Sequence, residues 1–92
     1  MAEAGFRVTG RVQGVGYRWW ARAQATRLGV TGTVRNADDG SVEVQARGSD
    51  AVLAELERLL GEGPPHGRVA QVERIPVSLS PGEAVDGFEI VR

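Results

Sequence analysis

Residues 10–24 read GRVQGVGYRWWARAQ, and they mark the change from a strand to a helix. Three glycines fall within seven residues, and a helical pattern then begins at Tyr17 without any Ser, Thr, Asp or Asn to cap it. The first four N–H groups of a helix have no partner inside the helix, and the helix dipole adds partial positive charge there. An uncapped helix start attracts an anion, so a bound anion is a candidate for the missing cap.

The sequence on either side of this stretch predicts the element order βαββαβ followed by a short tail strand. Strands are predicted where apolar and polar residues alternate, helices where the apolar spacing follows the helical period, and irregular segments where Gly and Pro cluster. Ser49 is the predicted N-cap of the second helix, and an Asp-Gly turn joins the middle two strands as a hairpin. The predicted elements are strands over 5–12, 30–36, 41–47, 69–79 and 88–92, helices over 17–28 and 50–63, an irregular connection in the stretch 61–67, and a turn over 81–87.

This order predicts where the chemistry lies. A strand–helix–strand unit leaves its two strands parallel, so the strands over 5–12 and 30–36 end at the same edge of the sheet. If the strand over 41–47 is inserted between them, the two ends lie roughly 10 Å apart, which is twice the spacing between strands. The loop 14–18 follows one end and Asn36 lies at the other. The gap suits a small tetrahedral anion and a water molecule.

The composition is that of one ordinary globular domain, predicted over residues 1–92. Apolar residues make up 41% of the chain, charged residues 25%, and the net charge is −1 with the charges dispersed, so no nucleic-acid footprint is expected. The chain has no Cys and no Lys, which excludes thiolate metal sites, a cysteine nucleophile and a P-loop lysine. No signal peptide or membrane span is predicted, and the expected location is the cytoplasm.

The glycine loop has the chemistry of an oxyanion cradle. Gly14 and Gly16 allow a sharp turn that presents successive N–H groups to an anion, and Arg18 adds a forked, permanently charged donor. Neither a Walker loop nor a dinucleotide-binding loop fits, because the first requires Gly-Lys-Ser/Thr and the second requires a small residue where Trp19 stands. From the residues alone, a plain tight turn remains an equal alternative.

Two segments decide between these readings. GRVQGVGYR (residues 10–18) and GTVRNADDGSVE (residues 32–43) closely resemble the two signature segments of the acylphosphatase family, and the resemblance extends over nearly the whole chain, including the GPP loop and the terminal FEIVR. It implies an α+β fold, the ferredoxin-like α/β sandwich, with a mixed or antiparallel sheet of four to five strands and two helices on one face. It also implies hydrolysis of acyl phosphates without a metal or other cofactor.

The resemblance implies a role for each residue of the site. The phosphate cradle falls on Gly14, Val15, Gly16, Tyr17 and Arg18, with Arg18 as the substrate-binding arginine and Asn36 as the residue that orients water. Two positions depart from the family pattern, since Tyr17 stands where Phe is more common and Thr33 where Trp is often found. Neither departure is expected to affect the chemistry. The expected partner is a small-molecule acyl phosphate, and a monomer is expected.

The reaction itself explains why so few groups would suffice. Phosphoryl transfer is catalysed mainly by positioning and by stabilising charge on the phosphoryl oxygens, and a carboxylate leaving group needs no proton donor. An amide such as Asn36 can accept from water and donate to a phosphate oxygen, but it is no strong base, so a substrate oxygen is expected to take the proton.

The other polar residues are predicted to have structural or surface roles. His66 is expected to be a solvated loop residue far from both segments, Asp38 and Asp39 to belong to the hairpin turn, and Arg35 to point to the sheet face opposite Asn36. Trp20 is expected to pack on the sheet, with no functional role for Trp19.

Three other functions fit the same element order. An RNA-recognition domain is disfavoured because the central strands offer no stacking aromatics. A sensor that binds an anion without turnover would use the same cradle, and only an assay separates it from an enzyme. An acylphosphatase-like domain of a larger carbamoyl-transfer protein is disfavoured because no further domain is expected.

Overall fold

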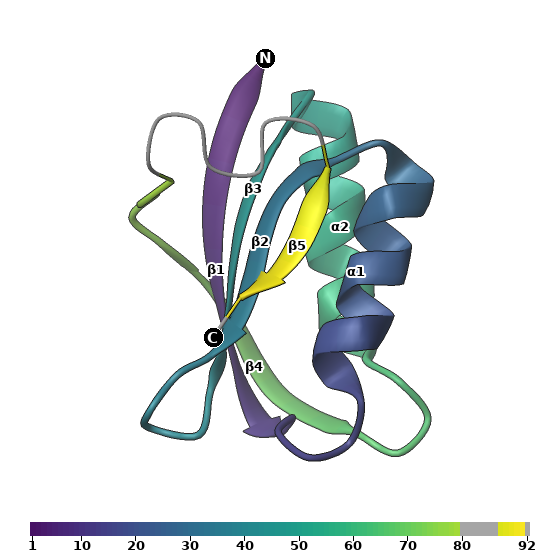
Figure 1. Cartoon of the computed structure of the whole chain (residues 1–92), viewed down its shortest axis with the longest axis vertical. Coiled ribbons are helices and arrows are strands. Elements are labelled where there is room, and N and C mark those ends of the chain that lie inside the picture. Colours follow the sequence, from purple (N-terminus) through teal and green to yellow (C-terminus); the bar gives the residue numbers. More distant parts are fainter. Residues whose placement is uncertain (80–86, 92) are drawn as a thin grey trace.

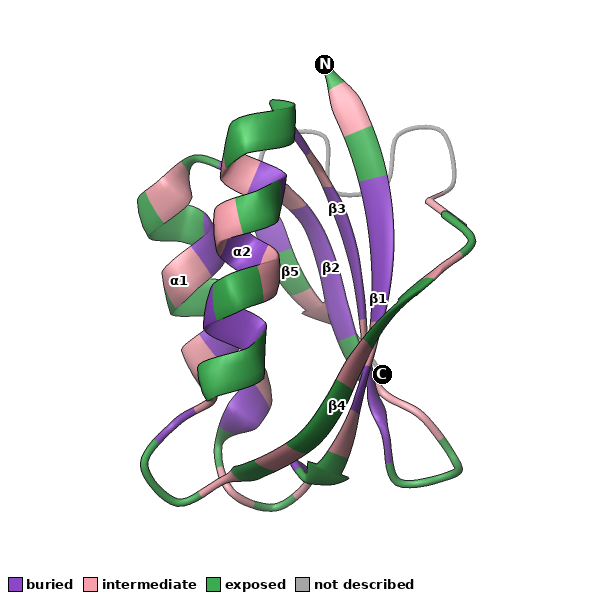
Figure 2. Ribbon diagram, turned by 180° about the vertical axis from the view of Figure 1, so that it is seen from behind, coloured by how far each residue is buried: buried purple, intermediate pink, exposed green. Residues whose placement is uncertain are grey.

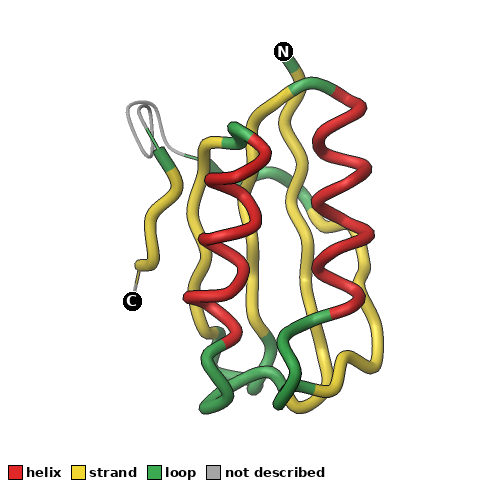
Figure 3. The backbone as a smooth tube through the Cα atoms, turned by 90° about the vertical axis from the view of Figure 1, so that its right-hand side faces the viewer, coloured by secondary structure: helices red, strands yellow, loops and turns green. Residues whose placement is uncertain are grey.

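The helices α1 and α2 lie side by side on one face of a mixed sheet, as the computed structural model of the chain shows (Figure 1). The structure describes residues 1–79 and 87–91. Within these residues the sheet has five strands, and Figure 3 shows the strands and the helices as separate layers. The elements are β1 (Ala2–Arg11), α1 (Tyr17–Leu28), β2 (Thr31–Asn36), β3 (Val42–Gly48), α2 (Asp50–Glu62), β4 (Arg68–Ile75) and β5 (Phe88–Val91).

The strand order β4-β1-β3-β2-β5 confirms the expected ferredoxin-like arrangement. Strand β3 is antiparallel to both β1 and β2, so β1 and β2 run in the same direction and end at the same edge. Strand β4 adds to β1 as an antiparallel edge, and β5 adds to β2 as a parallel edge. The insertion of β3 between β1 and β2 meets the condition that the sequence left open, and it is the arrangement that the ferredoxin-like fold implies.

The core lies between the sheet and the two helices, where the buried residues of Figure 2 face one another. Along the strands, buried residues that face the helices alternate with more exposed residues. The buried leucines of α2 point toward that face of the sheet. The N-cap of α2 is Ser49, as predicted, because its side chain accepts a hydrogen bond of 3.2 Å from the Val52 N–H. The fully buried larger side chains are Tyr17, Phe6, Leu53, Leu56, Leu60, Val8, Val12, Val34, Val42 and Val44.

Two element boundaries differ from the prediction by three residues or more. Strand β4 ends at Ile75 rather than at Leu79, because Pro76 has no N–H to donate to a sheet ladder. Strand β1 begins at Ala2 rather than at residue 5, because β3 continues to Gly48 and offers pairing partners along this length. The turn predicted over 81–87 lies, Gly87 apart, outside the described residues.

Candidate functional site

The loops in the two segments that resemble the family signatures, residues 10–18 and 32–43, lie at the same edge of the sheet. The β1–α1 loop and the β2–β3 turn lie at the lower end of the molecule in Figure 1, together with the α2–β4 connection. Strand β3 separates β1 from β2, so the loop 14–18 and Asn36 stand one strand apart. The structure therefore brings the predicted site residues to one edge, as expected for the two parallel strands of a strand–helix–strand unit.

The glycine loop adopts a left-handed backbone conformation at two positions. Gly14 has φ 76° and Gly16 has φ 79°, values that residues with a side chain rarely adopt. A Cβ atom built at either glycine would meet no atom within 4 Å, so backbone conformation rather than crowding explains the choice of glycine. The loop thus presents an uncrowded surface at both positions.

Helix α1 begins without a side-chain cap. Its N-cap residue is Gly16, which has no side chain to accept a hydrogen bond, and the first turn contains no acidic residue. The first backbone hydrogen bond of the helix runs from the Trp20 N–H to the Gly16 carbonyl oxygen (3.0 Å), so the three preceding N–H groups have no acceptor within the helix. Together with the helix dipole, these groups make the start of α1 a positive end suited to an anion.

Arg18 lies in this uncapped first turn and is half-buried. No carboxylate of the described residues forms an ion pair with it. Other arginines of the chain are engaged in such pairs, for instance Arg7, Arg35, Arg47, Arg58 and Arg74. Its guanidinium is therefore available to an incoming anion, and it can form two parallel hydrogen bonds to adjacent oxygens.

Asn36 is the last residue of β2 and pairs with Val42 of β3. Its side-chain oxygen Oδ1 is buried, and no donor from the described part of the chain reaches it. A buried acceptor without a donor costs about 1–3 kcal/mol, so such groups are uncommon, and a bound water or ligand is one explanation for them. Asn36 is thus an unsatisfied amide at the edge that also carries the uncapped helix start.

The two segments are joined by Gln13, to which the sequence analysis assigned no role. Its Nε2 group donates to the Ala37 carbonyl oxygen (2.8 Å) and to the Ser41 carbonyl oxygen (2.9 Å). Ala37 follows Asn36 directly, so the bridge ends beside the residue expected to orient water. The signal that could have revealed it is a polar residue inside the first segment, between buried Val12 and the cradle.

The expectation that His66 lies far from both segments was wrong for its loop. A Cβ atom on Gly67 would lie 3.4 Å from the Arg11 carbonyl oxygen, and one on Gly63 would lie 3.6 Å from Cε2 of Tyr17. The α2–β4 connection therefore packs beside the first segment, because α2 runs opposite to α1 and ends at the edge where α1 begins (Figure 1). His66 itself is exposed, as expected.

Tyr17 contributes its backbone, not its phenol, to the loop surface. The ring is buried, and the hydroxyl donates to the Leu60 carbonyl oxygen (2.6 Å). Burial raises the pKa of the Tyr17 phenol well above its ordinary value. Trp20 packs against the core, with its ring centroid 5.5 Å from that of Tyr17; its expected packing on the sheet stays a prediction.

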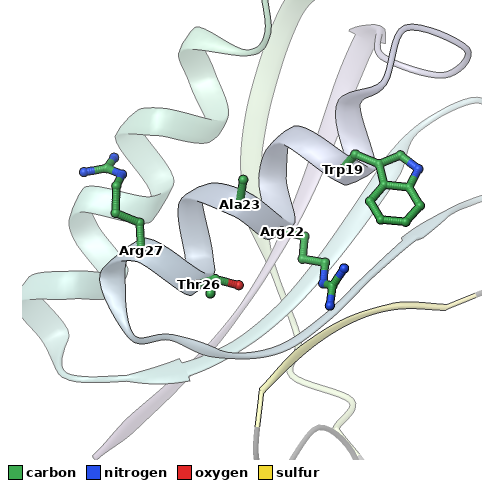
Figure 4. A pocket seen from close by; sticks show the side chains of 5 residues that line it. All are labelled: Trp19, Arg22, Ala23, Thr26 and Arg27. Atoms are coloured by element: carbon green, nitrogen blue, oxygen red, sulfur yellow. The ribbon is translucent and has the colours of Figure 1, made fainter.

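Trp19 lies outside this site. Its side chain is 65% exposed and lines a shallow groove along α1 with Arg22, Ala23, Thr26 and Arg27 (Figure 4). The Arg22 guanidinium carbon lies 5.8 Å from the centre of the indole, and Arg22 Nε donates to the Phe88 carbonyl oxygen. The residues that line this groove belong to α1, and the loop 14–18 contributes none of them.

The remaining polar residues behave as the sequence predicted. Arg35 forms a 2.7 Å ion pair with Glu43 on the open face of the sheet, while its neighbour Val34 is buried under the helices. Asp39 accepts hydrogen bonds from the Ser41 N–H (2.9 Å) and hydroxyl (2.6 Å), which lower the pKa of its carboxyl group and close the hairpin turn.

Residues 1–79 and 87–91 contain no group of three or more His, Cys, Asp or Glu side chains placed to hold a metal ion. None of the helices in this part of the chain combines the length and apolar character needed to cross a membrane.

Several known proteins similar to this chain are named acylphosphatase. A family model described as Acylphosphatase matches residues 4–90. A Salinibacter ruber protein named acylphosphatase is 49% identical over 83 residues, which cover 90% of this chain and 82% of that protein. A Xanthomonas oryzae pv. oryzae protein of the same name is also 49% identical over 83 residues, covering 90% of this chain and 94% of that protein. The crystal structure of acylphosphatase from Bacillus subtilis superposes with a TM-score of 0.88 at 32% identity and covers 100% of both chains.

Proposed function

We propose, since the chain belongs to the acylphosphatase family and is a hydrolase, that the loop 14–18, Arg18 and Asn36 together form its active site. The backbone N–H groups of Gly14, Val15, Gly16, Tyr17 and Arg18 hold the phosphoryl oxygens of an acyl phosphate. The observation that carries this proposal is the uncapped start of α1 with Arg18 in its first turn, one strand away from the unsatisfied amide of Asn36.

Binding and catalysis use the same groups. In phosphoryl transfer the charge of the transition state spreads over the three equatorial oxygens of the phosphoryl group. N–H groups at a helix start and a guanidinium are already oriented toward those oxygens, so they need no rearrangement as the charge develops. Arg18 has no competing carboxylate among the described residues, and its full charge acts on the substrate.

The bond that breaks joins phosphorus to the acyl oxygen. Water attacks phosphorus, the P–O bond to the acyl group breaks, and its electron pair leaves with the carboxylate. The conjugate acid of such a carboxylate has a pKa of about 4, so the leaving group departs without protonation. An alkyl phosphate would require a proton donor at this position, and neither segment supplies one.

Asn36 orients the attacking water. Its amide offers both an acceptor and donors, so it can hold the water while it contacts a phosphoryl oxygen. The proton released by the water goes to a phosphoryl oxygen of the substrate, because an amide cannot hold it. The products are the carboxylate and inorganic phosphate.

The test compares phosphate release from benzoyl phosphate and from p-nitrophenyl phosphate, in chelator, with the wild type and Arg18→Ala. Rapid turnover of the acyl phosphate alone, lost in the variant, supports the proposal. If the wild type hydrolyses neither compound while phosphate raises its Tm, the loop belongs to an anion sensor. Loss of wild-type activity in chelator would overturn the metal-free mechanism. A monomer, a cytoplasmic location and a single domain over 1–92 stay predictions.

A further inference from the structure

We infer that Gln13 is a positioning residue that sets the distance between the phosphate cradle and Asn36; the inference rests on the function proposed above. Its Nε2 group carries two hydrogens, and both are used, one toward the Ala37 carbonyl oxygen at 2.8 Å and one toward the Ser41 carbonyl oxygen at 2.9 Å. The side chain is half-buried, which protects both hydrogen bonds from exchange with water.

In the part of the chain that the structure describes, the hydrogen bonds of the sheet do not hold the chain between Val8 and α1 against β3, so the Gln13 side chain does this. The pairing of β1 with β3 ends at Val8 opposite Val42, whereas the pairing with β4 on the other side of β1 runs from Gly5 to Arg11. In the described residues, no ladder bond therefore ties the chain between Val8 and α1 to β3. Gln13 supplies this connection through Ser41, the residue that precedes Val42.

The other end of the bridge is a closed turn. The Ala37 N–H donates to the Ser41 carbonyl oxygen (2.8 Å), and the Gly40 N–H donates to the Ala37 carbonyl oxygen (3.2 Å). The Asp39 carboxylate holds Ser41 from the other side through its N–H and hydroxyl groups. Because the turn is braced in this way, Gln13 links the cradle to a rigid unit that begins directly after Asn36.

The geometry of the reaction makes this distance critical. Reacting atoms must come within about 3–3.5 Å in the correct orientation, and a misplacement of about 1 Å can lower the rate about 100-fold. The cradle amides and Arg18 belong to one loop and one helix start, so their mutual arrangement does not need Gln13. The relation of that unit to Asn36 does need it.

Gln13→Met is the first test, because Met has similar length and no donor. We expect kcat for benzoyl phosphate to fall at least about 10-fold, while the Ki of inorganic phosphate stays within about twofold. The matched control is Gln45→Met: Gln45 is 7% exposed, lies on β3, and its Oε1 accepts a hydrogen bond of 2.9 Å from the Ser78 N–H away from the site. The control should lose stability and keep kcat. A Gln13→Met enzyme with unchanged kcat overturns the inference.

A double-mutant cycle tests whether Gln13 acts through Asn36. If it does, adding Gln13→Met to Asn36→Ala should cost little further kcat, because the residue being positioned is already gone. Fully additive losses would show that Gln13 acts by another route.

Gln13→Glu keeps the test valid if the Met variant does not fold. Ionised Glu would turn two oxygens toward two carbonyl groups, whereas protonated Glu can donate one hydrogen bond. The kcat of this variant relative to the wild type should therefore rise as the pH is lowered toward the Glu pKa. A pH-independent ratio would contradict the inference. Failure of the proposed function looks different, because the wild type would then be inactive or Asn36→Ala fully active.

Discussion

The hydroxyl of Tyr17 donates a 2.6 Å hydrogen bond to the carbonyl oxygen of Leu60, and this bond joins the first residue of α1 to the last turn of α2. Carbonyl groups in the last turn of a helix have no partner inside it, so the phenol satisfies a buried acceptor of α2. The same bond lies at the helix start that carries Arg18.

Tyr17→Phe should destabilise the fold without impairing catalysis. The variant leaves the Leu60 carbonyl oxygen buried without this donor, which costs about 1–3 kcal/mol. Chemical denaturation should show this loss, while kcat and KM for benzoyl phosphate stay near the wild-type values. A large fall in kcat at full folding would mean that the phenol takes part in the reaction.

Alkaline pH should unfold the protein through the same residue. Burial raises the pKa of Tyr17 above its value of about 10 in the unfolded chain, so the folded state keeps its proton where the unfolded state loses it. Stability is therefore unaffected by this group below about pH 10 and falls as the pH rises further. The chain has 1 tyrosine, so phenolate absorbance reports on it alone. The absorbance should appear together with unfolding, and Tyr17→Phe should flatten the fall in stability. Phenolate formation in the folded protein near pH 10 would contradict this prediction.

Arg18→Ala should lower kcat/KM for acyl phosphates by about 10³ or more, by analogy with other arginines of phosphoryl transfer. The Ki of phosphate should rise in the same variant, because the guanidinium also binds the ground-state anion. Arg58→Ala is a matched control, since Arg58 pairs with Glu55 and Glu62 on the exposed face of α2. Equal inhibition of the wild type and Arg18→Ala by phosphate would show that Arg18 is not the anion anchor.

Asn36→Ala should lower kcat and leave phosphate binding largely intact, because the variant loses the group that orients water and keeps the cradle. Steady-state kinetics with phosphate as competitive inhibitor separate the two effects. The neighbouring variant Arg35→Ala provides the control, since Arg35 pairs with Glu43 on the opposite sheet face. If both variants lose kcat equally, the effect arises from the strand and not from the amide.

The Gly16→Ala variant should still fold. It should bind phosphate more weakly than the wild type does. A residue with a side chain is strained at φ 79° by about 1–2 kcal/mol, but its Cβ would meet no atom within 4 Å. Relief of this strain should turn the cradle N–H groups away from the anion. Gly29→Ala is the control, since Gly29 has φ 76° and equal space at the other end of α1. Both should lose similar stability, and only Gly16→Ala should raise the Ki of phosphate.

Local patterns predicted most of the elements because their causes are local. The bounds of α1 follow from the helical spacing after Tyr17 and from Gly29, which ends the helix in a left-handed conformation. The end of β4 was placed too late, because the apolar residues beyond Ile75 outweighed the missing N–H of Pro76. Strand β1 extends to Ala2 because Gly48 of β3 pairs with it, and the local sequence of β1 does not show this distant partner.

Local sequence alone specifies the glycine loop, the uncapped helix start, Arg18 beside it and Asn36 at the end of the second strand, because each depends on the chemistry of neighbouring residues. Which residues lie beside these groups depends on the packing of the whole fold. The Gln13 bridge to Ala37 and Ser41, the Tyr17 bond to Leu60 and the approach of the α2–β4 connection to Arg11 join residues far apart in the chain. Such contacts depend on how the helices and strands pack, and a local pattern of residue types carries no information about that packing.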